Sequence, residues 1–292
     1  MKGPFLAIIP AVLALSGCTN LQAVSTLSES LMTASATWND VGEELNASCV
    51  RLLQFNPLLD CPTPAAASSA IVATNTVLAN YFTALHDAAN ADNFTVQPGL
   101  DALAASAASI PGVKAEEVDA VSGLARTLAG LWTEHLRERA LRSLIKDGAP
   151  AAMTTIGLLQ RTVPHALQTT LAAEREGMNE QFTLYIERGG GAPPRPLATM
   201  CAPPPRTHDF SGPNFLLALE YCRRLGDLDQ KEKALDAYTT SLDEASKALI
   251  ELNSGKTRLG GKALAVKLHT IGKTLNDDLK AVHGAFAKGK SA

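Results

Sequence analysis

The chain has 292 residues and a formal net charge of −3 at neutral pH; 46% of its residues are hydrophobic and only 5% are aromatic. The small negative charge excludes a global positive field that would recruit nucleic acid. The scarcity of aromatic side chains argues against a groove that stacks bases or sugars. Abundant alanine and leucine favour long helices that pack closely, and the length suits one large bundle or two small domains.

The N-terminal segment has the features of a secretory signal peptide. Met1 and Lys2 give a short positively charged start, and an apolar run from Phe5 to Leu15 follows, interrupted only by Pro10. A helix of this length is too short to span a bilayer. We therefore expect residues 1–17 to be a cleaved signal rather than part of the folded domain.

This segment ends in Leu15-Ser16-Gly17-Cys18, which resembles the lipobox of bacterial lipoproteins. In that class the signal is cut before the cysteine, here Cys18, which carries a thioether-linked diacylglycerol and an acylated amino group. In enteric lipoproteins an Asp at the next position favours retention in the inner membrane. Thr19 stands there, so the resemblance implies the outer membrane, with the protein facing the periplasm. The alternatives are an ordinary signal peptide cleaved elsewhere and a buried apolar helix.

Four further cysteines follow Cys18: Cys49, Cys61, Cys201 and Cys222. An even number of cysteines in an exported protein indicates disulfides, with three possible pairings. Turn-forming residues separate the two members of each local pair, so we favour Cys49–Cys61 and Cys201–Cys222 over crossed pairings. Free buried cysteines are the alternative, and a zinc site is disfavoured because no Cys-x-x-Cys spacing occurs.

Apolar residues recur at intervals of three, four or seven through the first half of the chain, as in amphipathic helices. They predict a long helix ending at Asn56-Pro57, a second from near Pro64 to Asn90, a short one from Leu100 to Ile110, and one of about thirty residues from Val118 to Asp147-Gly148. The segment 19–35 is rich in serine and threonine, but its apolar residues keep helical spacing. We therefore favour the start of the first helix over a flexible tether.

A further helix is predicted from near Ala149 to about Ile186, and Pro164 is expected to kink it. Residues 189–212 are rich in glycine and proline and predict an irregular break. Two long helices follow, about 213–253 and 262–288. The prediction is an all-α, elongated, mostly antiparallel bundle of about six to seven helices. Its first part spans 18–188, and a helical hairpin over 213–292 completes it.

Catalytic motifs are incomplete throughout the sequence. His135 and Glu138 lie three residues apart, but arginines interleave with them and no His-Glu-x-x-His is present, which favours a solvated ion-pair surface. Ser254-Gly255-Lys256-Thr257 matches the end of a P-loop, but Ile250 occupies the position of the required glycine. We therefore predict no catalytic residues, no metal and no cofactor.

Two segments are candidates for recognition. Arg206, His208 and Asp209 lie in the proline-rich loop, which a disulfide would hold in place. The alternative is a surface loop that serves stability alone.

The last helix is the other candidate. Residues 256–290 contain eight Lys or Arg and two Asp, and Lys262, Lys273 and Lys280 share one helical face with His269. This basic face suits anionic headgroups or an acidic partner, while the alternative is an ordinary bundle helix with a solvated lysine face.

The leading hypothesis is a lipid-anchored, non-enzymatic adaptor or structural component of the bacterial cell envelope. It would contact the membrane through its N-terminal lipid and an envelope protein through the bundle, with no nucleic acid partner. The alternative is a carrier that binds a small apolar ligand or lipid between the helices.

Overall fold

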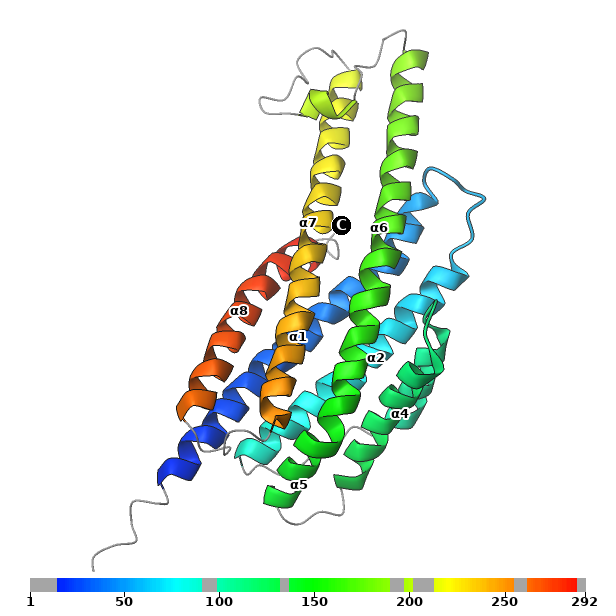
Figure 1. Ribbon diagram of the computed structural model, residues 1–292. Helices are drawn as coiled ribbons and strands as arrows, with labels where there is room; N and C mark the ends of the chain where they lie inside the picture. The colour runs from blue at the N-terminus through cyan, green and yellow to red at the C-terminus, as the bar shows by residue number, and fades with distance from the viewer. Residues whose placement is uncertain are drawn as a thin grey trace, which may run out of the picture.

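The computed structural model describes residues 15–90, 99–131, 137–189, 197–201, 213–254 and 262–287. Across these ranges the chain forms helices and turns and no strand, which confirms the predicted all-α bundle. The elements in chain order are α1 (Leu15–Leu52), α2 (Pro62–Asn90), α3 (Leu100–Ser106), η1 (Ala107–Ser109), α4 (Ala115–Gly130), α5 (Arg137–Ser143), η3 (Leu144–Gly148), α6 (Ala149–Arg188), η4 (Leu197–Cys201), α7 (Pro213–Asn253) and α8 (Lys262–Phe286). The long helices lie side by side and give the molecule an elongated shape (Figure 1).

Helix α1 is the centre of the bundle and packs against α2, α6, α7 and α8. Its apolar stripe is buried, as the helical spacing predicts, and includes Leu27, Leu31 and Trp38. The Trp38 indole donates a hydrogen bond from Nε1 to Ser241 Oγ on α7 at 2.9 Å, and its ring meets Phe82 of α2 edge-on. A single aromatic side chain thus joins three helices.

The serine- and threonine-rich segment 19–35 is helical from its beginning, as predicted. The hydroxyl groups donate to the carbonyl four residues earlier; Ser28 Oγ bonds Val24 O at 2.8 Å, and Ser35 Oγ bonds Leu31 O at 2.9 Å. Both serines are fully buried. Because these hydroxyls find partners on their own helix, they enter the core without an unsatisfied polar group.

Most neighbouring helices are antiparallel, in agreement with the prediction, but α1 and α8 run in the same direction. Ser30 Oγ accepts a hydrogen bond from Asn276 Nδ2 at 3.4 Å, and Asp40 Oδ2 lies 3.7 Å from His283 Nδ1. Residue numbers therefore rise together along the two helices. As a result, the beginning of α8 lies at the same end of the bundle as the beginning of α1 (Figure 1).

The predicted helix from Val118 to Asp147-Gly148 is wrong in two respects. Helix α4 ends at Gly130, where the low helix propensity of glycine favours an end. From Arg137 onward, helix α5 continues through the π-helical turn η3 directly into α6, so the chain does not leave the helix at Gly148.

Gly148 marks a close contact between helices instead of a helix end. A Cβ atom at this position would lie 2.8 Å from Cε2 of the fully buried Tyr81 ring of α2. The Tyr81 hydroxyl donates to Leu144 O at 3.1 Å, and the backbone N–H of Ala149 donates to the same carbonyl across the π turn. The absent side chain of Gly148 therefore lets Tyr81 reach the backbone of η3.

Pro164, which was expected to kink the helix, lies inside α6, and the helix continues on both sides of it.

Both favoured disulfide pairings are confirmed. Cys49–Cys61 closes the turn between α1 and α2, and Cys201–Cys222 joins η4 to α7. The turn after α1 is also held by Asn56, whose side-chain Oδ1 accepts a hydrogen bond from the Leu58 N–H at 3.2 Å. Within the region 189–212, the five residues of η4 form a short helical turn, which the second disulfide attaches to α7. The prediction that this whole region is irregular is therefore wrong for η4.

We expect Gly148→Ala to destabilise the protein by about 1–3 kcal/mol, because the new methyl group must displace the buried Tyr81 ring. Gly157→Ala in the same helix is the matched control. Nothing lies within 4 Å of a Cβ atom at that position, so alanine should raise stability by about 0.5–1 kcal/mol. Urea unfolding followed by circular dichroism measures both, and equal stabilities for the two variants would contradict the close contact.

Candidate functional site

Only some of the predicted site residues lie within the described ranges of the chain. Arg206, His208 and Asp209 lie outside the described residues, as do the side chains of His135 and Glu138. Lys262, Lys273 and Lys280 are exposed on one face of α8, while the opposite apolar stripe is buried in the core. The bundle-helix interpretation of α8 is therefore correct for its apolar face.

In the part of the chain that the structure describes, no group of three or more His, Cys, Asp or Glu side chains is placed to hold a metal ion. Among the same residues, no helix is both long enough and apolar enough to cross a membrane.

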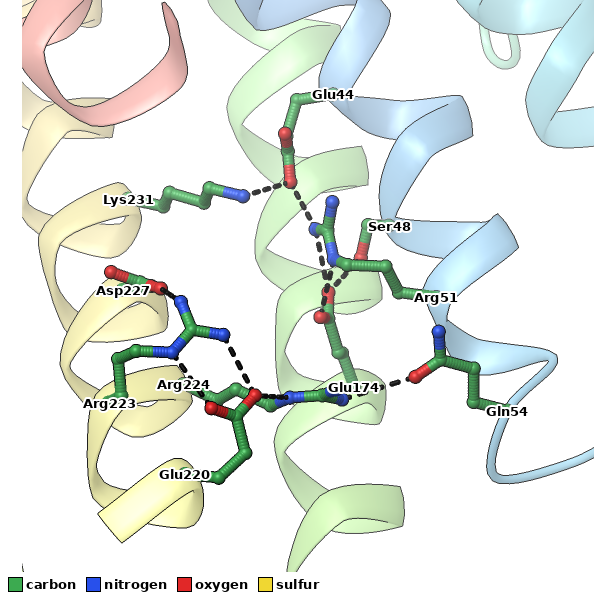
Figure 2. A network of polar contacts seen from close by, with 10 residues as sticks. All are labelled: Glu44, Ser48, Arg51, Gln54, Glu174, Glu220, Arg223, Arg224, Asp227 and Lys231. Atoms are coloured by element: carbon green, nitrogen blue, oxygen red, sulfur yellow. Dashed lines mark hydrogen bonds and ion pairs between the residues drawn. The ribbon is translucent and has the colours of Figure 1, made fainter. Parts of the chain in front are cut away.

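A buried network of charged side chains joins α1, α6 and α7 (Figure 2). Arg51 donates from Nε to Glu174 Oε1 at 2.6 Å and from Nη2 to Glu174 Oε2 at 2.9 Å, and it also pairs with Glu44. Lys231 Nζ lies 2.7 Å from Glu44 Oε1, and Ser48 Oγ donates to Glu174 Oε2 at 2.7 Å. Two cations and two carboxylates therefore balance each other in the interior.

Burial makes this balance important. The side chains of Glu44, Glu174 and Lys231 are only 5%, 10% and 8% exposed. Burial lowers the pKa of Arg51, but the hydrogen bonds and the negative charges of Glu174 and Glu44 outweigh that effect and raise it above its ordinary value. Since a buried unpaired charge is costly, the three helices must keep this register.

A second, more exposed cluster continues along α7 (Figure 2). Glu220 accepts hydrogen bonds from Arg223 and Arg224, and Arg224 Nη1 donates to Gln54 Oε1 in the turn after α1 at 3.1 Å. The hydrogen bonds from Arg223 lower the pKa of Glu220 to about 2, against the opposing effect of partial burial and with help from Arg224. The cluster ties α7 to the turn between α1 and α2.

Helices α6 and α7 extend beyond the end of α1 (Figure 1). We call residues 178–188 of α6 and 213–224 of α7 the arm. The Phe182 and Tyr221 rings pack between these helices with centroids 4.5 Å apart, and the Tyr221 hydroxyl donates to Asn179 Oδ1 at 2.8 Å. The Cys201–Cys222 disulfide attaches η4 to the same part of α7. The arm therefore has its own internal contacts.

Large apolar side chains are exposed on the arm and beside it. Leu216 is 67% exposed, and Tyr185 is 49% exposed. Most of the strongly exposed large apolar residues in the described ranges lie at this end of the molecule. We call the following set the apolar end surface: Leu58, Leu184, Tyr185, Leu216 and Leu219.

Two small hollows flank Tyr185 on this surface. One has a volume of about 200 Å³ and lies towards Leu184 and Arg188; the other has a volume of about 170 Å³ and lies towards Phe182 and Tyr221. Both are smaller than the usual pockets for small molecules, which begin near ~300 Å³. Their size suits single side chains of a partner protein.

The apolar end surface was not predicted, although the sequence contains a signal for it. Phe182, Leu184, Tyr185 and Ile186 fall within five residues of one helix, and Leu216, Leu217 and Leu219 fall within four of another. One helical face cannot bury so many side chains at once.

Comparisons with protein-family models, with curated proteins and with solved structures found no match.

We expect Glu174→Gln to destabilise the protein by about 2 kcal/mol, because the change leaves the buried cations in excess; the value is below that of a fully buried pair since Arg51 is partly exposed. Glu176→Gln, at an exposed position two residues along α6, should change stability by less than about 0.5 kcal/mol. Thermal unfolding compares the two variants. A similar loss of stability in both would show that the network does not hold the helices together.

Proposed function

We propose that the protein is a lipid-anchored, non-enzymatic adaptor of the bacterial cell envelope. It is attached to a membrane at Cys18, facing the periplasm from the outer membrane, and it binds a protein partner through the apolar end surface. The observation that carries the proposal is the group of exposed leucine and tyrosine side chains on the arm. A gathering of large exposed apolar side chains at one end of a protein is typical of interaction sites.

The placement of the arm supports the proposal that one end of the bundle is attached to the membrane and the other binds the partner. The arm and the beginning of α1, which contains Cys18, lie at opposite ends of the elongated bundle (Figure 1). Helices α6 and α7 have 40 and 41 residues, which corresponds to about 60 Å at 1.5 Å per residue. A protein attached at Cys18 would therefore hold the apolar end surface away from its attachment point.

The attachment itself is supported by two independent features of the chain. Leu15-Ser16-Gly17-Cys18 resembles a lipobox, and the two disulfides agree with an oxidising compartment outside the cytoplasm. Helix α1 already includes Cys18. The bundle would then follow the lipid without a flexible tether between them.

The apolar end surface also favours a protein partner over a small ligand. Tyrosine and leucine side chains flanked by side-chain-sized hollows are typical of protein–protein contacts in which a few residues contribute most of the affinity. A carrier for an apolar ligand, the alternative function, would need an apolar hollow between the helices. The hollows beside Tyr185 are instead lined in part by the charged residues Glu180, Arg188 and Arg224, and the larger groove between α1 and α8 is lined in part by Lys273, Asp277 and Lys280.

The attachment is tested by metabolic labelling with a radioactive fatty acid in cells that produce the full chain. We expect the wild-type protein to incorporate the label and Cys18→Ser to incorporate none, because the thiol is the acceptor of the diacylglycerol. Thr19→Ser, a change at the next position, should leave the labelling intact. Labelling of the Cys18→Ser variant would contradict attachment at this residue.

The partner site is tested by photo-crosslinking in intact cells with a photoreactive amino acid at Leu216. We expect a crosslinked protein whose yield falls about tenfold when Tyr185→Asp introduces a charge between the two hollows. Ile250→Asp is the matched control, since Ile250 is also an exposed apolar residue of α7 but lies near its opposite end. Equal yields from both variants would contradict recognition by the apolar end surface.

A further inference from the structure

A groove of about 580 Å³ runs between the first turns of α1 and the middle of α8. Its α1 side carries amide and hydroxyl groups, including those of Gln22 and Thr26, and its floor includes Ala23, Leu268 and Gly272. The Gln22 amide and the Thr26 hydroxyl can both donate hydrogen bonds. The α1 side of the groove therefore offers donors to a ligand that accepts hydrogen bonds.

The α8 side of the groove adds positive charge. Lys273, Lys280 and His269 line it, and Asp277 is the single acidic residue of the described lining. Lys280 Nζ lies 2.8 Å from Asp277 Oδ1, so this carboxylate is already paired within α8. The hydrogen bond from Lys280 lowers the pKa of Asp277, and the charge of Lys273 helps to lower it. Lys273 nevertheless forms no ion pair within 4.0 Å with any described residue, which leaves its ammonium group available to an anion.

The exposed face of α8 extends this basic lining towards the beginning of the helix. Lys262 and Lys280 are 18 residues apart, which is about five turns of an ideal helix, so both project from the same face. Val266 lies on this face as well and is 58% exposed. An apolar side chain among lysines is typical of helices that rest on a membrane surface, where the lysine stems cover apolar area and their ammonium groups meet the headgroups.

The position of this face relative to Cys18 identifies the source of the anion. Because α1 and α8 are parallel, Lys262 at the beginning of α8 lies at the same end of the bundle as Cys18 (Figure 1). Gln22, the first groove residue of α1, follows Cys18 by one helical turn, or about 6 Å along the axis. A membrane attached at Cys18 would therefore place lipid headgroups next to the groove.

We propose that the groove between α1 and α8, with the adjoining lysine face of α8, binds the phosphate groups of anionic phospholipids in the membrane that carries the protein. The bundle then rests with its α1–α8 side against the membrane surface. Lys273 contacts a headgroup phosphate directly, and Val266 inserts at the level of the headgroups. The proposal rests on the proposed attachment only for its location, since the recognition itself uses residues of the folded bundle.

The test uses the full chain with Cys18→Ser, so that binding does not depend on the covalent lipid. Co-sedimentation with phosphatidylcholine vesicles and with vesicles containing equal parts of phosphatidylcholine and phosphatidylglycerol gives a ratio of affinities. Every variant carries the same N-terminal segment, whose contribution cancels between variants. We expect the ratio to favour the anionic vesicles and to fall about fivefold with Lys273→Gln, since a lysine near an anionic surface contributes ~1 kcal/mol.

Lys267→Gln is the matched control, because Lys267 is an exposed lysine of α8 that pairs with Glu251 and does not line the groove. An unchanged ratio in this variant supports the proposal. An equal fall in both variants, or a fall in neither, overturns it.

Inorganic phosphate at the same phosphate concentration should not displace the protein from the anionic vesicles. Displacement would show that the groove takes free phosphate and would overturn the assignment to lipid. None of these outcomes depends on acylation of Cys18 or on the apolar end surface.

Discussion

The relative positions of α1, α6 and α7 depend on the pairing of charges buried between them. Arg51 and Lys231 neutralise Glu44 and Glu174, and the side chains of Glu44, Glu174 and Lys231 are too deeply buried to exchange their partners for water without opening the bundle (Figure 2). Apolar packing alone would tolerate small shifts of one helix along another. A buried ion network does not, because a shift would leave a charge unpaired.

This register gives the molecule two ends with different surfaces. Because Glu174 of α6 and Lys231 of α7 are both bonded to α1, the remaining turns of the two helices extend past α1 as the arm and expose apolar side chains there. At the other end, α1 and α8 begin side by side, which places the first part of the lysine face of α8 at the end of the bundle where α1 begins. One arrangement of helices thus separates the apolar end surface, which we propose binds a protein, from the lysine face of α8, which we propose binds a membrane.

The helical pattern was predictable because it is a local property. The spacing of Leu27, Leu31 and Trp38 indicates one buried stripe whatever lies opposite it, and each disulfide pair is separated by turn-forming residues. Gly148 shows where local interpretation fails. Glycine indicates a helix end from the sequence, but here it permits contact with Tyr81, a residue more than sixty positions away. Contacts between distant segments cannot be read from the local spacing of apolar residues.

The sequence by itself determined that this chain is an all-α bundle with an N-terminal segment resembling a lipoprotein signal, since both properties depend on neighbouring residues. It also placed Lys273 and Lys280 on one helical face. Only the tertiary structure decided that this face borders a groove beside α1, and that Leu184 and Tyr185 are exposed instead of buried. The physical reason is that a side chain's burial depends on which helices pack over it, and that packing follows from charges and contacts brought together by the whole fold.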